Sequence, residues 1–179
     1  MNFKEQNDNA RAFFNQDFSL VNNLILCIRK SLCDGSEPEA DFCALEKFMN
    51  FTPGLSFVYV SLFQSETEMI RFGSKRDTLK HTLERIISGL KQNQNFSKFE
   101  INNPDKCRIM FEYVTSRREL PYKKIQSSKF NSLRFEIGID GIEINDGTQS
   151  YYYMPTDAIV QSHMGFKNAF SSLLKKTPI

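Results

Sequence analysis

Three stretches of the chain carry apolar residues at every third or fourth position, which is the spacing of one helical face. They cover residues 17–33, a segment that begins at Asp77 or Thr78, and residues 165–175. Asp and Thr are residues that commonly cap the beginning of a helix. The expected buried stripes are Leu20, Val21, Leu24, Ile25, Ile28 and Leu32 in the first, Leu79, Leu83, Ile86, Ile87 and Leu90 in the second, and Phe166, Ala169, Phe170, Leu173 and Leu174 in the third. A short helix is also expected near residues 41–48.

Other stretches are rich in β-branched and aromatic residues, which is typical of strands. Residues 55–63 are apolar at both alternating sets of positions, so we expect a central strand buried on both faces. A second strand is predicted over residues 68–72, where Gly73 ends it. A third strand is predicted over residues 108–114.

The region after residue 130 has the pattern of a meander of three strands. Apolar and polar residues alternate over residues 133–139, and Asp140-Gly141 is a strong signal for a two-residue hairpin turn. Asp146-Gly147 predicts a second turn, and Pro155 is expected to stop the last strand. The other two strands are predicted over residues 142–144 and 150–154.

Strands and helices follow each other without regular alternation, which favours an α+β fold over a doubly wound sheet. We expect a mixed, largely antiparallel sheet of about six strands, with three main helices packed on it. Residues 1–16 are predicted to be a flexible N-terminus. Residues 17–179 are predicted to form a single domain, either alone or as one domain of a longer protein.

Composition excludes several classes of protein. The 179 residues are 40% hydrophobic and 25% charged, which excludes a disordered tail or a collagen-like fibre. No stretch approaches the roughly 20 apolar residues of a membrane span, and the polar beginning lacks the apolar core of a signal peptide. We therefore expect a cytoplasmic protein with no membrane association. Its four cysteines form no CxxC pair and are interpreted as reduced thiols.

Candidate catalytic residues are few. Cys107 lies between two basic residues, which would favour a reactive thiolate, and His81 and His163 are the two possible general bases. No known nucleophile, zinc-binding or phosphate-loop motif is present. The glycines and aspartates of residues 138–147 lack the spacing of a calcium loop. We therefore expect no metal and no cofactor, and favour a non-catalytic protein; an enzyme that combines Cys107 with a histidine is the alternative.

A second alternative is binding to single-stranded nucleic acid. Residues 106–134 contain eight bases against two acids, interleaved with Tyr113, Tyr122 and Phe130. Cations for phosphates and aromatic rings for bases are the usual combination for this task. The whole chain has a formal charge of only +2, which favours an ordinary solvated loop, so nucleic acid is not the expected partner.

Four segments resemble the AMMECR-like domain family, named for a candidate region in the AMME syndrome. Gly54–Leu62 is similar to a strand of that family, and Phe135–Ile144 to its hairpin with a central Asp-Gly. Tyr153-Met154-Pro155 and Phe166–Lys176 resemble its Leu-Leu-Pro step and closing helix. The resemblance implies a non-catalytic accessory or binding domain that acts beside a protein partner or a fused domain.

The family's hallmark motif, Leu-Arg-Gly-Cys-Ile-Gly, corresponds here to residues 70–75, Ile-Arg-Phe-Gly-Ser-Lys. The apolar-Arg opening and a displaced glycine remain, and the cysteine is absent. The predicted binding residues are Arg71, Gly73, Lys75 and Arg76. They precede a helix whose first N–H groups and dipole favour negative charge, so we expect a site for an anionic small ligand or a partner here.

Overall fold

The computed structural model describes residues 18–64, 69–114, 116, 139–145, 150–160 and 166–175. The chain falls into two compact units, Met1–Ser116 and Arg117–Ile179. The assignment of residues 17–179 to one domain stays a prediction. The predicted flexible N-terminus, residues 1–16, lies outside the described residues.

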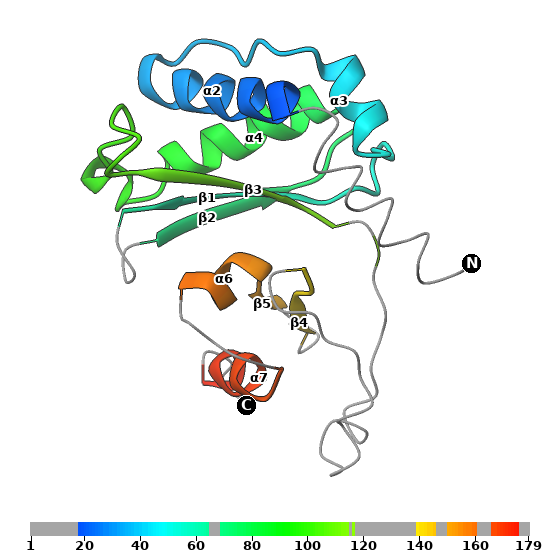
Figure 1. The fold of residues 1–179 in the computed structure, drawn as a ribbon, viewed down its shortest axis with the longest axis vertical. Helices are drawn as coiled ribbons and strands as arrows, with labels where there is room; N and C mark the ends of the chain where they lie inside the picture. Colours follow the sequence, from blue (N-terminus) through cyan, green and yellow to red (C-terminus); the bar gives the residue numbers. More distant parts are fainter. Residues whose placement is uncertain are drawn as a thin grey trace. The chain divides into compact units, whose positions relative to one another are not determined.

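The first unit is built on an antiparallel three-stranded sheet with the order β2-β1-β3 (Figure 1). The central strand β1 (Val58–Phe63) pairs with β2 (Met69–Ser74) on one side and with β3 (Arg108–Tyr113) on the other. Every residue of β1 is buried, so the prediction of a central strand buried on both faces is confirmed. The strand begins three residues later than expected because Leu55 lies in an exposed turn.

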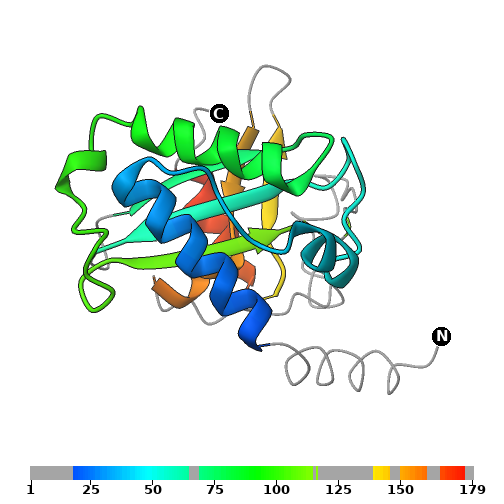
Figure 2. The ribbon, with the colours of Figure 1, turned by 90° about the horizontal axis from the view of Figure 1, so that it is seen from above.

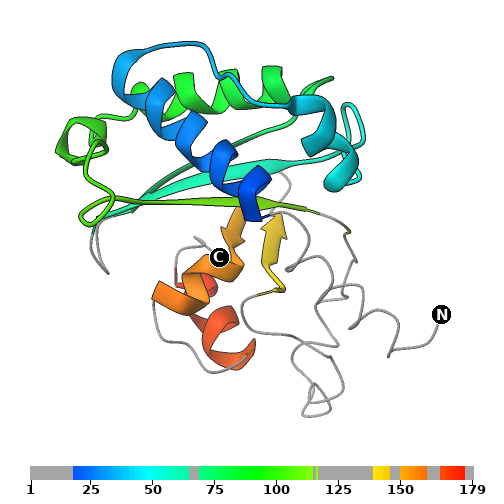
Figure 3. The same ribbon diagram turned by 45° about the horizontal axis from the view of Figure 1, so that its top comes forward.

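The helices of this unit cover one face of the sheet. They are α2 (Phe18–Asp34), α3 (Phe42–Phe48) and α4 (Leu79–Lys91), followed by the short 3₁₀ helix η1 (Phe96–Lys98). Seen from above, α2 and α4 cross the strands, and a tilted view shows all three α-helices on the same side (Figures 2 and 3). Alternate residues of the strands face them and complete the core, among them Val58, Val60, Leu62, Ile70 and Ile109.

The stripe predicted for α4 is confirmed, because all five of its apolar residues are buried in this core. Gly89 of the same helix allows Phe72 of β2 to pack closely, since a Cβ there would lie 2.4 Å from the phenyl ring. No helix among the described residues is long and apolar enough to cross a membrane.

The second unit contains a two-stranded antiparallel sheet and two helices. Strand β4 (Ile142–Asn145) pairs with β5 (Ser150–Tyr153), and α6 (Pro155–Val160) and α7 (Phe166–Leu174) follow. Tyr153, Ala158, Ala169 and Leu173 form its small core. The predicted strand at 133–139 and the turn at Asp146-Gly147 lie outside the described residues.

One local expectation was wrong, and one helix was not predicted. Gly73 does not end β2, because the strand continues to Ser74 and Gly73 pairs with Tyr59. Pro155 follows the end of β5, as expected, and it also begins α6, a helix that was not predicted. Proline is favoured in the first turn of a helix because it lacks only an N–H that would be unpaired there. Asp157 supports this start by accepting a hydrogen bond from the backbone N–H of Met154 at 2.8 Å.

The α+β class is confirmed. The described strands form two antiparallel sheets of three and two strands, where a single sheet of about six was expected.

Candidate functional site at the start of helix α4

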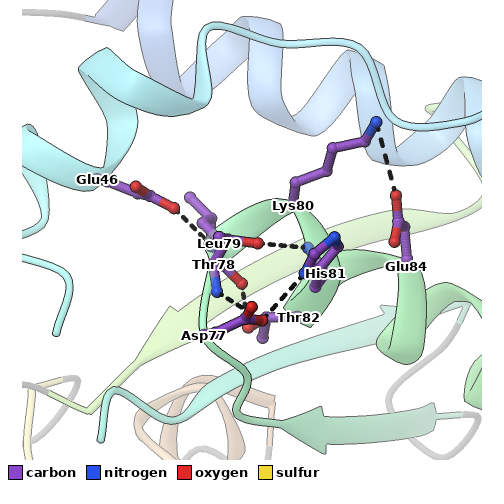
Figure 4. Close-up of polar contacts among 8 residues, drawn as sticks. All are labelled: Glu46, Asp77, Thr78, Leu79, Lys80, His81, Thr82 and Glu84. Atoms are coloured by element: carbon purple, nitrogen blue, oxygen red, sulfur yellow. Dashed lines mark hydrogen bonds and ion pairs between the residues drawn. The ribbon is translucent and has the colours of Figure 1, made fainter. Parts of the chain in front are cut away.

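The loop from β2 to α4 ends in a capped helix. Thr78 has an extended backbone, and its Oγ1 accepts a hydrogen bond from the N–H of His81 at 3.1 Å. The hydroxyl of Thr82 donates back to the carbonyl of Thr78 at 2.7 Å (Figure 4). Thr78 is thus the cap, one of the two residues that the sequence predicted. This arrangement satisfies backbone groups that a helix would otherwise leave unpaired.

Two carboxylates of the chain itself occupy the positive end of α4. Glu46 of α3 accepts a hydrogen bond from the N–H of Leu79 at 2.7 Å, and Asp77 accepts one from the N–H of Thr78 at 3.1 Å (Figure 4). Negative groups at this end of a helix are stabilised by its dipole. The donors that we expected to bind an external anion therefore contact internal ones.

Asp77 also holds the side chain of His81, which lies one helical turn further on. The Asp77 Oδ1 atom is 3.0 Å from the His81 Nδ1 atom, and the two side chains are 72% and 56% exposed. The hydrogen bond to Asp77 raises the pKa of His81 above its ordinary value, and the same bond lowers the pKa of Asp77. Asp77 thus orients the imidazole of His81 on the surface, beside the predicted binding loop.

We expect the pKa of His81 measured by NMR titration to lie above that of an ordinary histidine and to fall in Asp77→Asn. Folding raises the pKa of His81. The stabilising effect of the His81–Asp77 pair is therefore fully present below the pKa of an unfolded histidine, and it is lost as pH rises through the raised pKa. The lowered pKa of Asp77 means that the effect is also lost as pH falls through that value. The pair therefore stabilises most between about pH 4 and about pH 6.5.

The His163→Gln variant assigns the two histidine signals. Glu84→Gln is the matched control, because Glu84 raises the pKa of His81 less than Asp77 does. If the pKa of His81 fell at least as much in Glu84→Gln as in Asp77→Asn, the negative charge around His81 would set its pKa, and not the hydrogen bond to Asp77.

Arg71 is bound within the sheet. Its Nε donates a hydrogen bond to the Ser61 Oγ at 2.7 Å, and its Nη2 is 3.7 Å from the Glu112 Oε2. The Arg71 and Glu112 side chains are only 13% and 12% exposed. The guanidinium thus joins all three strands, from β2 across β1 to β3, and its geometry indicates a structural role in the sheet.

Gly73 is also part of the sheet. The rings of Phe57 and Tyr59 stack with their centroids 4.8 Å apart, and a Cβ on Gly73 would lie 2.5 Å from the Tyr59 ring. The close approach that we expected at this glycine is therefore made by the chain's own aromatic residues. Of the four predicted binding residues, Lys75 and Arg76 are the two that lie exposed in the loop.

Three exposed cations lie directly after β2 or over it from the middle of α4. Lys75 and Arg76 follow β2 directly, and Arg85 of α4 places its guanidinium carbon 5.9 Å from the centre of the Phe72 ring. We call Lys75, Arg76 and Arg85 the cationic group. Arg85 was not among the predicted binding residues, although its place one turn after His81, on the exposed side of the predicted helix, is a signal that could have found it.

The carboxylates near the cationic group have other partners. Asp77 pairs with His81, and Glu84 lies 3.8 Å from Lys80, which also reaches Glu37 at 3.2 Å. Within the part of the chain that the structure describes, no carboxylate pairs with a member of the cationic group. Its three charges therefore face solvent uncompensated.

The candidate nucleophile Cys107 is buried in the core. Desolvation raises the pKa of its thiol, with a smaller opposing effect from the charge of Arg29. The Arg29 guanidinium donates to the backbone carbonyl of Cys107 at 2.9 Å. A buried thiol with a raised pKa is a poor nucleophile because little thiolate is present. His163 lies outside the described residues.

Other candidate chemistry receives little support from the described residues. No group of three or more His, Cys, Asp and Glu side chains among them could hold a metal ion. Of the basic segment 106–134, the structure describes residues 106–114 and 116. There Lys106 pairs with Glu100 at 2.9 Å, so its charge is compensated.

Comparisons with known proteins give no relative. No protein-family model, no curated protein and no solved structure matches the chain. The similarity to the AMMECR-like domain family therefore stays a prediction, and the cationic group is the site feature on which a functional proposal can be built.

Proposed function

We propose that the protein is a non-catalytic binding domain, of the accessory kind that the AMMECR-like resemblance implies, and that it recognises an anionic partner through the cationic group. The partner is a separate protein or a fused domain. The observation that carries the proposal is the uncompensated charge of Lys75, Arg76 and Arg85, beside carboxylates that are already paired.

The chemistry of the surrounding residues supports binding over catalysis. The best candidate nucleophile is a buried thiol whose pKa is raised. The helix end that would suit a small phosphate holds Glu46 and Asp77. What remains is a set of long, exposed cations, which is typical of a surface that attracts and orients a charged macromolecule.

The test is binding of a fluorescein-labelled decaglutamate peptide to the full chain, measured by fluorescence anisotropy. We expect the triple variant Lys75→Gln, Arg76→Gln, Arg85→Gln to bind at least about tenfold more weakly, because each exposed charge contributes a fraction of a kcal/mol to about 1 kcal/mol. The difference should shrink as salt is raised, since exposed charges are screened.

The matched control removes the same charge elsewhere. Lys30, Lys98 and Arg108 are also exposed, so their triple change to Gln alters the net charge equally. Retained binding by this control supports the proposed site. An equal loss in both triple variants, or no binding by the unaltered chain, would overturn the proposal.

A further inference from the structure

We propose, on the basis of the proposed function, that the partner is an acidic extended peptide that adds as a further strand to the outer edge of β2, the edge that no described strand occupies.

The outer edge of β2 is available for pairing. In the order β2-β1-β3, no strand of the described residues pairs with β2 on the side away from β1. An edge strand presents alternate backbone N–H and C=O groups outward, and these groups form a template for another strand. With six residues, β2 is as long as a typical strand and can hold a peptide of similar length.

The cationic group lies along this edge strand. Arg85 stands over Phe72, in the middle region of β2, while Lys75 and Arg76 continue from its last residue, Ser74. Phe72 and Ser74 are two positions apart, and therefore face the same side of the sheet. Cations in these places disfavour a basic strand and favour an acidic one.

The other edge of the same sheet has a different character. Strand β3 carries both Arg108 and Glu112, and Glu112 is paired with Arg71 within the sheet. Just before β3, Lys106 is paired with Glu100. Charge complementarity to an acidic peptide therefore selects β2.

The geometry also predicts the pattern of acidic residues in the peptide. Side chains of a strand alternate between faces, so peptide residues opposite Phe72 and Ser74 are also two apart on one face. One acid would reach Arg85 and the other Lys75 or Arg76. We therefore expect acidic residues at alternate positions to bind better than the same number placed consecutively.

The experiment uses the full chain and four eight-residue peptides that share one amino-acid composition. The first has glutamates at alternate positions, the second has them consecutive, and the third is the first with two backbone N–H groups on one edge replaced by N-methyl. We expect the first to bind at least about fivefold tighter than the second, and at least about tenfold tighter than the third, because two hydrogen bonds are lost without any change in charge. The fourth peptide carries the N-methyl pair on the opposite edge, since either edge of the peptide can face β2, and the larger of the two losses is the one compared.

Amide hydrogen exchange gives a second readout. Binding of the first peptide should slow exchange at alternate residues of β2 and leave β3 unchanged. Equal affinities for all four peptides, with the cationic-group variant still weakened, would overturn strand addition and leave the proposed function standing. Failure of these peptides to bind, while decaglutamate binds, would overturn strand addition alone, and failure of decaglutamate as well would overturn both.

Two further outcomes would also overturn the peptide assignment. A single-stranded oligonucleotide that binds tighter than the first peptide and depends on the cationic group would assign the site to nucleic acid. A stable dimer of the free chain that the peptide displaces would assign the β2 edge to a second copy.

Discussion

Replacement of Arg29 by methionine is expected to lower the free energy of unfolding by about 3 kcal/mol. The Arg29 guanidinium donates one hydrogen bond to the carbonyl of Ile101 and one to the carbonyl of Cys107. Both acceptor residues are buried, so the variant leaves two carbonyl groups without their charged donor. Methionine keeps the aliphatic packing of the side chain, and the loss therefore reports mainly on the hydrogen bonds. Chemical denaturation of the full chain, followed by circular dichroism, measures the change.

Two variants complete this test. Lys30→Met removes a positive charge from the next residue of α2, which is exposed, and is expected to change stability by less than about 0.5 kcal/mol. Arg29→Lys keeps the charge but has a single nitrogen to reach two carbonyls, and an intermediate loss is expected. Equal stabilities of Arg29→Met and Lys30→Met would show that the two hydrogen bonds from Arg29 to carbonyl groups do not hold the segment before β3 on α2.

Replacement of Gly73 by alanine is expected to lower the free energy of unfolding by about 2 kcal/mol. Alanine normally fits a strand better than glycine, by roughly 0.5–1 kcal/mol, so a loss would reverse the usual sign. The reason is space, because the added Cβ would lie 2.5 Å from the buried Tyr59 ring and 2.7 Å from Phe57. Denaturation as above measures the effect.

A double-mutant cycle isolates the contact between Gly73 and the Tyr59 ring. Tyr59→Ala destabilises the fold by itself, but it removes the ring that the new methyl group meets. The cost of Gly73→Ala should therefore fall by more than about 1 kcal/mol in the Tyr59→Ala background. An unchanged cost would place the strain elsewhere in β2.

The helices and strands of the first unit follow closely from periodicity. The apolar stripe of α4 faces the core because residues three and four apart share a helical face, and this pattern needs no knowledge of the partner surface. The same is true of Thr78 as a cap and of β1 as a strand buried on both sides. Local patterns also led to the loop that holds Lys75 and Arg76.

The roles of Arg71 and Arg29 depend on contacts that no local pattern contains. Arg71 was predicted to bind an external anion, but the pairing of β1 with β2 sets it directly opposite Ser61 and within reach of Glu112. Arg29 meets carbonyls that are 72 and 78 residues away in the chain. From sequence alone, a charged side chain is expected to face solvent. Only the folded structure shows that a buried hydrogen-bond acceptor lies within its reach.

The same reason explains what happened to the predicted anion site. The sequence shows a helix beginning after a basic loop, and both features are present in the structure. Glu46, more than 30 residues earlier, comes from α3 to accept a hydrogen bond at that helix end, while Arg85 joins the loop cations from the next turns of α4. Propensity and periodicity act over a few residues, and they therefore determine where each helix and strand lies in the chain. Pairing between distant charges and carbonyl groups depends instead on how these elements pack. Because of that packing, the candidate site consists of the cations beside β2 and not of the helix end.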